Sequence, residues 1–245
     1  MNDEAIKKGI QEYWNERSAD YDASPGHGLH GEDEKAAWLC FLRSVLPGVG
    51  LRVLDAGCGT GFLTMLAAEL GHTVHGVDLS EGMMADAKKK AEASGFSERI
   101  SFAQGDVEHL ADADETYDAV INRHLLWTLP HPYEAVTEWL RVLKPGGRVI
   151  VIDGNWQKRK DDQPEPKPEE KETHRGYSEE ISAALPLRNG ENDPVDFIRR
   201  EGYPLRIQEL VQVDLVERKK YPEEEWVRRK EYHRVAYLLD KPKQE

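Results

Sequence analysis

Three glycines and an acidic residue stand together where a short apolar run gives way to a helical pattern. The segment reads Val53-Leu-Asp-Ala-Gly-Cys-Gly-Thr-Gly61, with Asp55 two positions before the first glycine. Glycines spaced as G-x-G-x-G allow a tight turn and let the backbone approach a ligand without an intervening Cβ. A dinucleotide site uses G-x-G-x-x-G, and its helix N-terminus receives a pyrophosphate. The Asp55 carboxylate would repel that anion. The segment therefore favours a ligand with a positively charged amino group.

Two more acidic residues close the next two apolar runs of the chain. Asp78 ends the segment 73–78, where a carboxylate is placed to accept hydrogen bonds from the two hydroxyls of a ribose. Asp106 follows the run 100–104, where it can accept a hydrogen bond from the exocyclic amine of adenine. Each acid alone is also typical of a helix N-cap or a turn. In this order, on consecutive strand ends, the three acids indicate S-adenosylmethionine.

The elements that position these acids alternate between strands and helices. Short apolar runs predict strands at 51–55, 73–78, 100–104, 117–122 and 148–153. Amphipathic patterns predict helices at 3–22, 32–46, 62–70, 81–94 and 133–143. This alternation predicts an α/β fold with a parallel sheet covered by helices on both faces.

The C-terminal third follows a less regular pattern. The stretch 157–176 is charged and proline-rich, and we interpret it as a mobile loop, either a solvated spacer or a lid near the site. Beyond it the pattern predicts helices at 177–185, 194–201 and 223–234, and strands at 205–216 and 235–239. Two late strands without a long crossover between them predict an antiparallel edge of the sheet.

Five segments of the sequence resemble the class I S-adenosylmethionine-dependent methyltransferases, in their small, UbiE-like branch. They are VLDAGCGTG at 53–61, VDLSEGMM at 77–84, GDVEHL at 105–110, YDAVINRHLLWTL at 117–129 and LKPGGRVIVID at 143–153. The resemblance covers about residues 10–155 well and the remainder only in pattern. It implies a Rossmann-like, seven-stranded, mostly parallel sheet whose last strand is antiparallel. It also implies an N-terminal helical lid or substrate cap over 1–46 and a cofactor-binding domain over 47–245.

The resemblance further implies which residues bind S-adenosyl-L-methionine, whose product is S-adenosyl-L-homocysteine. By this resemblance, Asp55 and the glycines line the methionine part of the cofactor and Asp78 binds the ribose. Asp106 and Val107 hold the adenine. Asn122 offers its backbone carbonyl to the methionine amine, and Tyr21 resembles a tyrosine of the lid. The full expected set is Tyr21, Asp55, Ala56, Gly57, Cys58, Gly59, Gly61, Asp78, Leu79, Met83, Gly105, Asp106, Val107 and Asn122.

Histidines and tryptophans gather where an acceptor should lie. Methyl transfer from a sulfonium is an in-line displacement, so the protein mainly aligns the acceptor and excludes water. A hydroxyl acceptor also needs a general base, for which His124 is our first candidate and His30 our second. His27, Trp127 and Trp156 are candidates for acceptor binding. The alternative is that all five are loop or packing residues. The spacing of the histidines matches no metal-ligand pattern, so we expect no metal site.

Composition limits the class of acceptor. The formal net charge is −13, which disfavours nucleic acids and anionic membranes. No apolar leader or run of 18 apolar residues is present, and the two cysteines form no CxxC pair, so we expect a cytoplasmic protein. Asn122-Arg-His-Leu stands where amide and adenine-N6 methylases carry N-P-P-[YF]. We therefore expect a small-molecule acceptor. A methyltransferase for RNA or protein, a catalytically silent cofactor-binding protein and an NAD-linked oxidoreductase are the alternatives, and the oligomeric state stays open.

Overall fold

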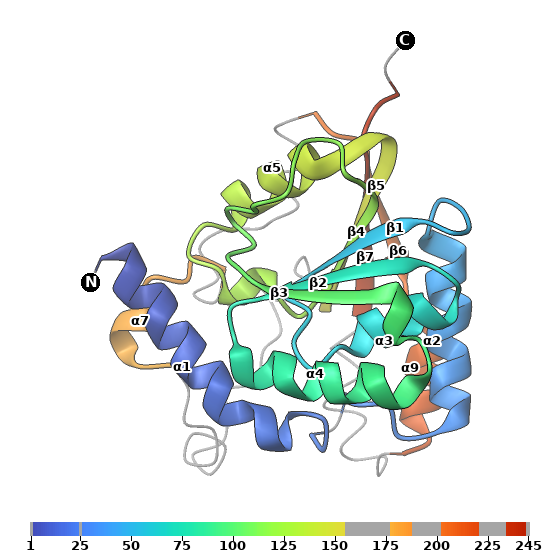
Figure 1. The fold of residues 1–245 in the computed structure, drawn as a ribbon, viewed down its shortest axis with the longest axis horizontal. Coiled ribbons are helices and arrows are strands. Elements are labelled where there is room, and N and C mark those ends of the chain that lie inside the picture. Colours follow the sequence, from blue (N-terminus) through green and yellow to red (C-terminus); the bar gives the residue numbers. More distant parts are fainter. Residues whose placement is uncertain (1, 25, 155–176, 188–201, 221–233, 244–245) are drawn as a thin grey trace.

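The fold is built on a single mixed sheet. The computed structural model describes residues 2–24, 26–154, 177–187, 202–220 and 234–243 (Figure 1). The strands are β1 (Arg52–Ala56), β2 (Thr73–Asp78), β3 (Ile100–Gln104), β4 (Tyr117–Arg123), β5 (Leu143–Gly154), β6 (Leu205–Glu209) and β7 (Arg234–Asp240). The helices are α1 (Asp3–Tyr21), α2 (Glu32–Val45), α3 (Phe62–Glu69), α4 (Glu81–Ser94), α5 (Pro132–Val142), α7 (Glu179–Ala183) and α9 (Val211–Arg218), with short 3₁₀ turns at Ser97–Arg99 and Leu126–Thr128.

The strand order places a crevice at one edge of the sheet. The seven strands run in the order β3-β2-β1-β4-β5-β7-β6. β1 to β5 are parallel, β7 is antiparallel to β5, and β6 is antiparallel to β7. The predicted Rossmann-like sheet with a reversed last strand is therefore confirmed. Since the order reverses direction between β1 and β4, ligands are expected at the carboxyl ends of these two strands.

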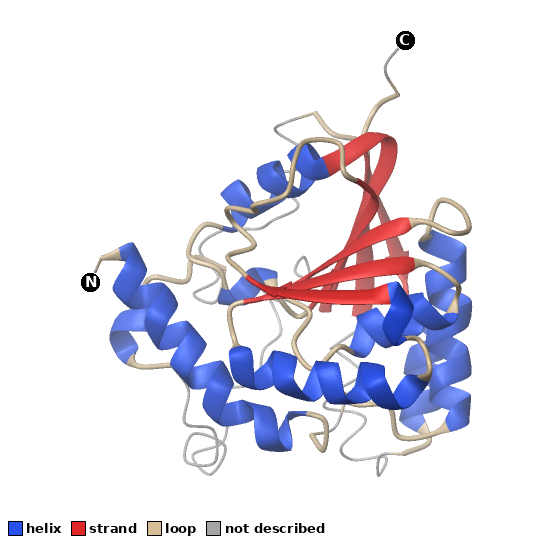
Figure 2. Ribbon diagram, in the orientation of Figure 1, coloured by secondary structure: helices blue, strands red, loops and turns tan. Residues whose placement is uncertain are grey.

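Helices cover both faces of the sheet (Figure 2). Successive residues of a strand pack on opposite faces. In β4, Val120 packs with α5, whereas Ala119 and Ile121 pack on the face that carries α2 and α3. Strands buried on both faces are typical of parallel sheets, and this explains their nearly continuous apolar sequences.

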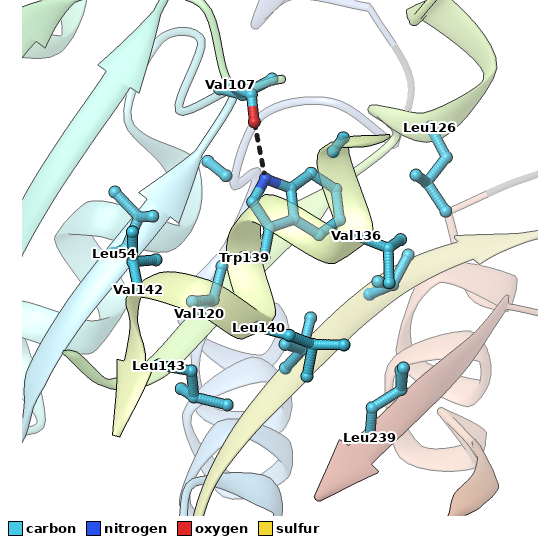
Figure 3. Close-up of a cluster of buried hydrophobic side chains, with 14 of the residues drawn as sticks. Leu54, Val107, Val120, Leu126, Val136, Trp139, Leu140, Val142, Leu143 and Leu239 are labelled. Atoms are coloured by element: carbon cyan, nitrogen blue, oxygen red, sulfur yellow. Dashed lines mark hydrogen bonds between the residues drawn. The ribbon is translucent and has the colours of Figure 1, made fainter. Parts of the chain in front are cut away.

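Trp139 of α5 is among the largest fully buried side chains of the described residues (Figure 3). Its indole Nε1–H donates a hydrogen bond of 3.0 Å to the backbone carbonyl of Val107. The bond joins α5 to the loop after β3, which also carries Asp106. The core and the predicted adenine end of the site are thus held by the same side chain.

The N-terminal segment divides between two locations. α1 lies along α4, whereas α2 packs between α3 and α9. Trp38, Leu42 and Val45 of α2 belong to the core on that face of the sheet. Only α1 therefore lies over the carboxyl edge, and the role of 1–46 as a lid stays a prediction.

Two sequence predictions for strands are wrong in their bounds. The run 205–216 is a strand only to Glu209, and Val211–Arg218 is α9. Leu210, Val213 and Glu217 are buried at helical spacing, and the alternation V-x-V-x-L concealed this period. β5 begins at Leu143 rather than 148, because Leu143 already pairs with Tyr117 before a register shift.

Other C-terminal predictions have mixed outcomes. The predicted helix 177–185 is shorter and spans Glu179–Ala183, while the last strand is confirmed as Arg234–Asp240. The loop 157–176 and the helix 194–201 lie outside the described residues, as does 223–233 of the third predicted helix.

Truncating Trp139 should strongly destabilise the fold. We expect Trp139→Ala to lower the free energy of unfolding by about 3–5 kcal/mol, because it leaves a cavity and removes the donor to Val107. Urea unfolding followed by circular dichroism measures this change. Val49→Ala, at a side chain that is 91% exposed, is the control and should change stability by less than about 0.5 kcal/mol. Equal effects of the two substitutions would contradict the assignment of Trp139 to the core.

Candidate functional site

A cleft of about 700 Å³, including the space at its open mouth, lies at the carboxyl edge of the sheet. The residues that both line it and were predicted from the sequence are Tyr21, Gly57, Gly59, Asp78, Leu79, Met83, Asp106, Val107 and His124. They come from α1, from the ends of β1, β2, β3 and β4, and from α4.

The glycine turn after β1 is fixed from behind. The N–H groups of Gly57 and Cys58 donate to the carbonyl of Val77, at 2.8 and 3.1 Å. Gly57 has a φ of +68°, and a Cβ there would lie 2.5 Å from the side chain of Leu125. Both the backbone conformation and the close approach therefore require glycine at this position.

Asp78 holds two loops of the cleft together. One carboxylate oxygen accepts the N–H of Gly59 and the other accepts the N–H of Ser80, each at 2.8 Å. Burial raises the pKa of this carboxyl above its ordinary value, and the two N–H donors oppose the rise. The side chain still lines the cleft, so its remaining lone pairs are available to a ligand.

Asp106 lies at the other end of the cleft and is paired with Lys7 of α1. The Lys7 ammonium is 2.7 Å from Asp106 and 2.6 Å from the buried Glu108. Burial alone raises the pKa of Asp106, but the hydrogen bonds from Lys7 and from the Glu108 N–H outweigh it and lower the pKa. The ion pairs raise the pKa of Lys7 despite its own burial. Nothing in the sequence indicated these contacts, which join residues about one hundred positions apart.

Asp55 is buried behind the glycine turn. It is 2% exposed and accepts a hydrogen bond of 2.5 Å from the Thr64 hydroxyl. Burial raises the pKa of Asp55 to about 7, although the hydrogen bond from Thr64 opposes this. The carboxyl therefore supports the turn and does not itself line the cleft.

Comparison with known proteins agrees with this geometry. Residues 54–151 match the family described as a methyltransferase domain. A ubiquinone biosynthesis O-methyltransferase of Rhizobium leguminosarum bv. trifolii is 38% identical over 113 residues, which are 46% of this chain and 44% of that protein. The ubiquinone/menaquinone biosynthesis C-methyltransferase UbiE of Roseobacter denitrificans is 31% identical over 156 residues, 62% of this chain and 52% of that protein.

Over residues 54–151 the chain is thus similar to class I methyltransferases of the UbiE-like branch. The chain spans about half the length of the curated relatives it matches. Two solved structures share the fold along nearly their whole length. The [4+2]-cyclase SpnF has a TM-score of 0.66 at 17% identity, over 97% of each chain. The geranyl diphosphate C-methyltransferase of Streptomyces coelicolor A3(2) has a TM-score of 0.62 at 18% identity, over 96% of this chain and 97% of that one.

His124 lies in the cleft, directly after β4. Its backbone φ is +57°, a region that few residues other than glycine adopt. The ring Nδ1 lies 3.6 Å from Oδ1 of Asp153, which is 1% exposed. Burial lowers the pKa of His124 and Asp153 partly restores it. His124 therefore combines access to the cleft with a carboxylate that can orient its ring.

The other predicted histidines and tryptophans lie in different places. His30 is exposed and does not line the cleft. The ring of His27 lies 4.4 Å from that of Tyr21 and 6.1 Å from that of His124, just behind the wall. Trp127 packs against Trp14 of α1 at 6.2 Å. Trp156 lies outside the described residues.

The remaining predicted cofactor residues surround the cleft without lining it. This group consists of Asp55, Ala56, Cys58, Gly61, Gly105 and Asn122. Asn122 is fully buried, and neither polar atom of its side chain has a hydrogen-bond partner. Whether its backbone carbonyl meets a ligand stays a prediction.

Sequence reasoning missed half of the cleft wall. The unpredicted lining residues are Lys7, Ile10, Trp14, Glu108, Arg123, Leu125, Thr128, Leu129 and Pro130. The helical spacing of Ile10 and Trp14 marked a packed face but not what it packs against. Asp106, Glu108 and His109 lie close enough to hold a metal ion, and the Lys7 ammonium already contacts the two carboxylates.

The buried Asp55 should make stability depend on pH. The folded state retains its proton to about pH 7, whereas the ordinary pKa is 3.8, so its contribution to stability falls as pH rises between these values. From about pH 4 to about pH 8, we expect Asp55→Asn to gain up to about 4 kcal/mol of unfolding free energy relative to the wild type. Urea unfolding at the two pH values measures this difference. A difference that is the same at both pH values would refute the assignment.

Proposed function

We propose that this protein is an S-adenosylmethionine-dependent methyltransferase that acts on a small-molecule acceptor. The observation that carries the proposal is the position of Asp78 and Asp106 in one cleft with Gly57 and Gly59, at the point where the strand order reverses. A carboxylate at the second strand end suits a ribose, and a glycine turn allows close approach of the methionine part. Relatives named as methyltransferases over the same residues support the reaction type.

The cleft residues fit the cofactor in a definite order. Asp106 and Val107 would hold adenine, Asp78 the ribose hydroxyls, and the turn at Gly57 and Gly59 the methionine part. When bound, S-adenosylmethionine supplies a methyl group on a sulfonium, which is already an electrophile. The chain's own task is then to align the acceptor and exclude water.

His124 is the residue that we propose as general base. It lines the cleft at the end of β4, and Asp153 lies beside its Nδ1, which leaves Nε2 for an acceptor hydroxyl. Its lowered pKa keeps the ring neutral, and hence able to accept a proton, near pH 7. His30 is too exposed for this role, and His27 lies behind His124.

Binding of the cofactor tests the proposal directly. We expect calorimetric titration to show micromolar binding of S-adenosylmethionine and S-adenosylhomocysteine, and none of NAD. Asp78→Ala should weaken both by about 100-fold, because charged hydrogen bonds to the ribose are lost. Asp86→Asn, on the outer side of α4, is the control and should bind like the wild type. Binding of NAD alone, or of no nucleoside, would overturn the proposed function.

Turnover tests the base once screening has identified an acceptor. His124→Asn preserves the positive φ, since asparagine tolerates this region, and removes the basic ring. We expect kcat to fall by about 100-fold or more while the affinity for S-adenosylhomocysteine is unchanged. In the wild type, kcat/KM should fall only when the pH drops below the lowered pKa of His124. An unchanged kcat in the variant would exclude His124 as the base.

A further inference from the structure

Arg123 is a buried cation at the inner end of the cleft. It is the last residue of β4 and lines the cleft with Gly57 and Tyr21. One guanidinium nitrogen donates to the backbone carbonyl of His27 at 2.5 Å. The guanidinium also stacks 3.6 Å above the ring of Phe62, the first residue of α3. These contacts hold the group rigidly beside the glycine turn.

Within the part of the chain that the structure describes, no carboxylate forms an ion pair with Arg123. None of those residues places a carboxylate oxygen within 4.0 Å of its guanidinium. Burial lowers the pKa of Arg123 to about 10 and Arg234 adds to this, while Tyr21, Glu217 and Asp55 oppose it. Arg234 differs, because both of its terminal nitrogens bond to the buried carboxylate of Glu217. Burying a cation costs free energy unless an anion pairs with it. The Arg123 guanidinium lacks such an ion-pair partner.

The neighbours of Arg123 add donors and positive charge. The Tyr21 phenol lies close enough for Arg123 to lower its pKa, although burial raises that pKa overall. Arg17 has a buried Nε without a hydrogen-bond partner. Burial, with His124, Arg123 and Arg17 nearby, lowers the pKa of His27 to about 3, so its ring is neutral. The inner end therefore carries the guanidinium groups of Arg123 and Arg17, with the carboxylates of Asp78 and Asp22 near Tyr21.

We propose that Arg123 and Tyr21 form a carboxylate-binding subsite at the inner end of the cleft. The guanidinium matches the two oxygens of a carboxylate, and such paired bonds are strong and directional. The carboxylate belongs either to the methionine part of the cofactor or to an acidic acceptor, and both would reach this end. The inference rests on the proposed function, because that function supplies both sources.

The first arm of the test compares two nucleosides that differ only in this group. They are S-adenosylhomocysteine and its decarboxylated analogue, in which the carboxylate is replaced by hydrogen. Calorimetry measures their binding to the wild type, to Arg123→Gln and to Arg123→Lys. If the cofactor supplies the carboxylate, Arg123→Gln should weaken S-adenosylhomocysteine by about 10- to 100-fold and leave the analogue unchanged. Arg123→Lys keeps the positive charge and should therefore weaken the binding of S-adenosylhomocysteine less than Arg123→Gln does.

The second arm tests an acidic acceptor. Benzoate is titrated into the complex with S-adenosylhomocysteine and followed by NMR. If the acceptor supplies the carboxylate, the Arg123→Gln substitution should abolish benzoate binding. The variant should still bind both nucleosides with wild-type affinity. Arg43→Gln, an exposed change of equal charge, is the control. Thermal unfolding verifies that each variant is folded.

Two results would overturn the subsite. The first is that Arg123→Gln binds both nucleosides and benzoate with wild-type affinity. The second is that it binds both nucleosides equally more weakly and binds benzoate with unchanged affinity. Failure of the proposed function looks different, because then the wild type binds neither nucleoside. Benzoate titrated into the protein alone still tests Arg123 in that case: loss of binding in Arg123→Gln supports the subsite, and equal or absent binding in both proteins refutes it.

Discussion

The carboxylate of Asp78 is the contact on which the rest of the site depends. It joins the glycine turn after β1 to the start of α4 through two backbone N–H donors. Backbone donors in a turn and at a helix start would otherwise need water or a ligand. Because one side chain satisfies both, the turn and the helix keep a fixed separation before any ligand arrives. A preorganised wall of this kind lowers the entropy lost on binding.

Charge is distributed unevenly along the cleft. Asp78, Asp106 and Glu108 supply carboxylates to the cleft, the last two paired with Lys7, and Arg123 supplies a cation beside the glycine turn. A ligand that carries hydroxyl and amino groups at one end and a carboxylate at the other is complementary to this arrangement. The net charge of the whole chain says nothing about it, since 46 acidic and 33 basic residues can be placed in many ways.

Sequence reasoning predicted the sheet and the acids at its edge because both follow local rules. Alternating apolar runs and glycine-ended helices specify the order of elements, and the ends of parallel strands must lie at one edge. Lys7 and Glu108 were missed because their pairing depends on where α1 docks. Arg123 was passed over because burial without a carboxylate partner is a property of the folded chain. The strand predicted over 205–216 failed beyond Glu209 because a short alternating run fits either period.

The length of α1 has a consequence for how the two ends of the cleft communicate. Its 19 residues extend for about 28 Å. Lys7 contacts Asp106 near one end, and Asn15 accepts bonds from Ser80 and Gly82 midway. Beyond the last turn, Asp22 accepts a hydrogen bond from Thr60. Because one helix contacts both ends of the cleft, any change in affinity that a ligand at one end causes at the other must be reciprocal.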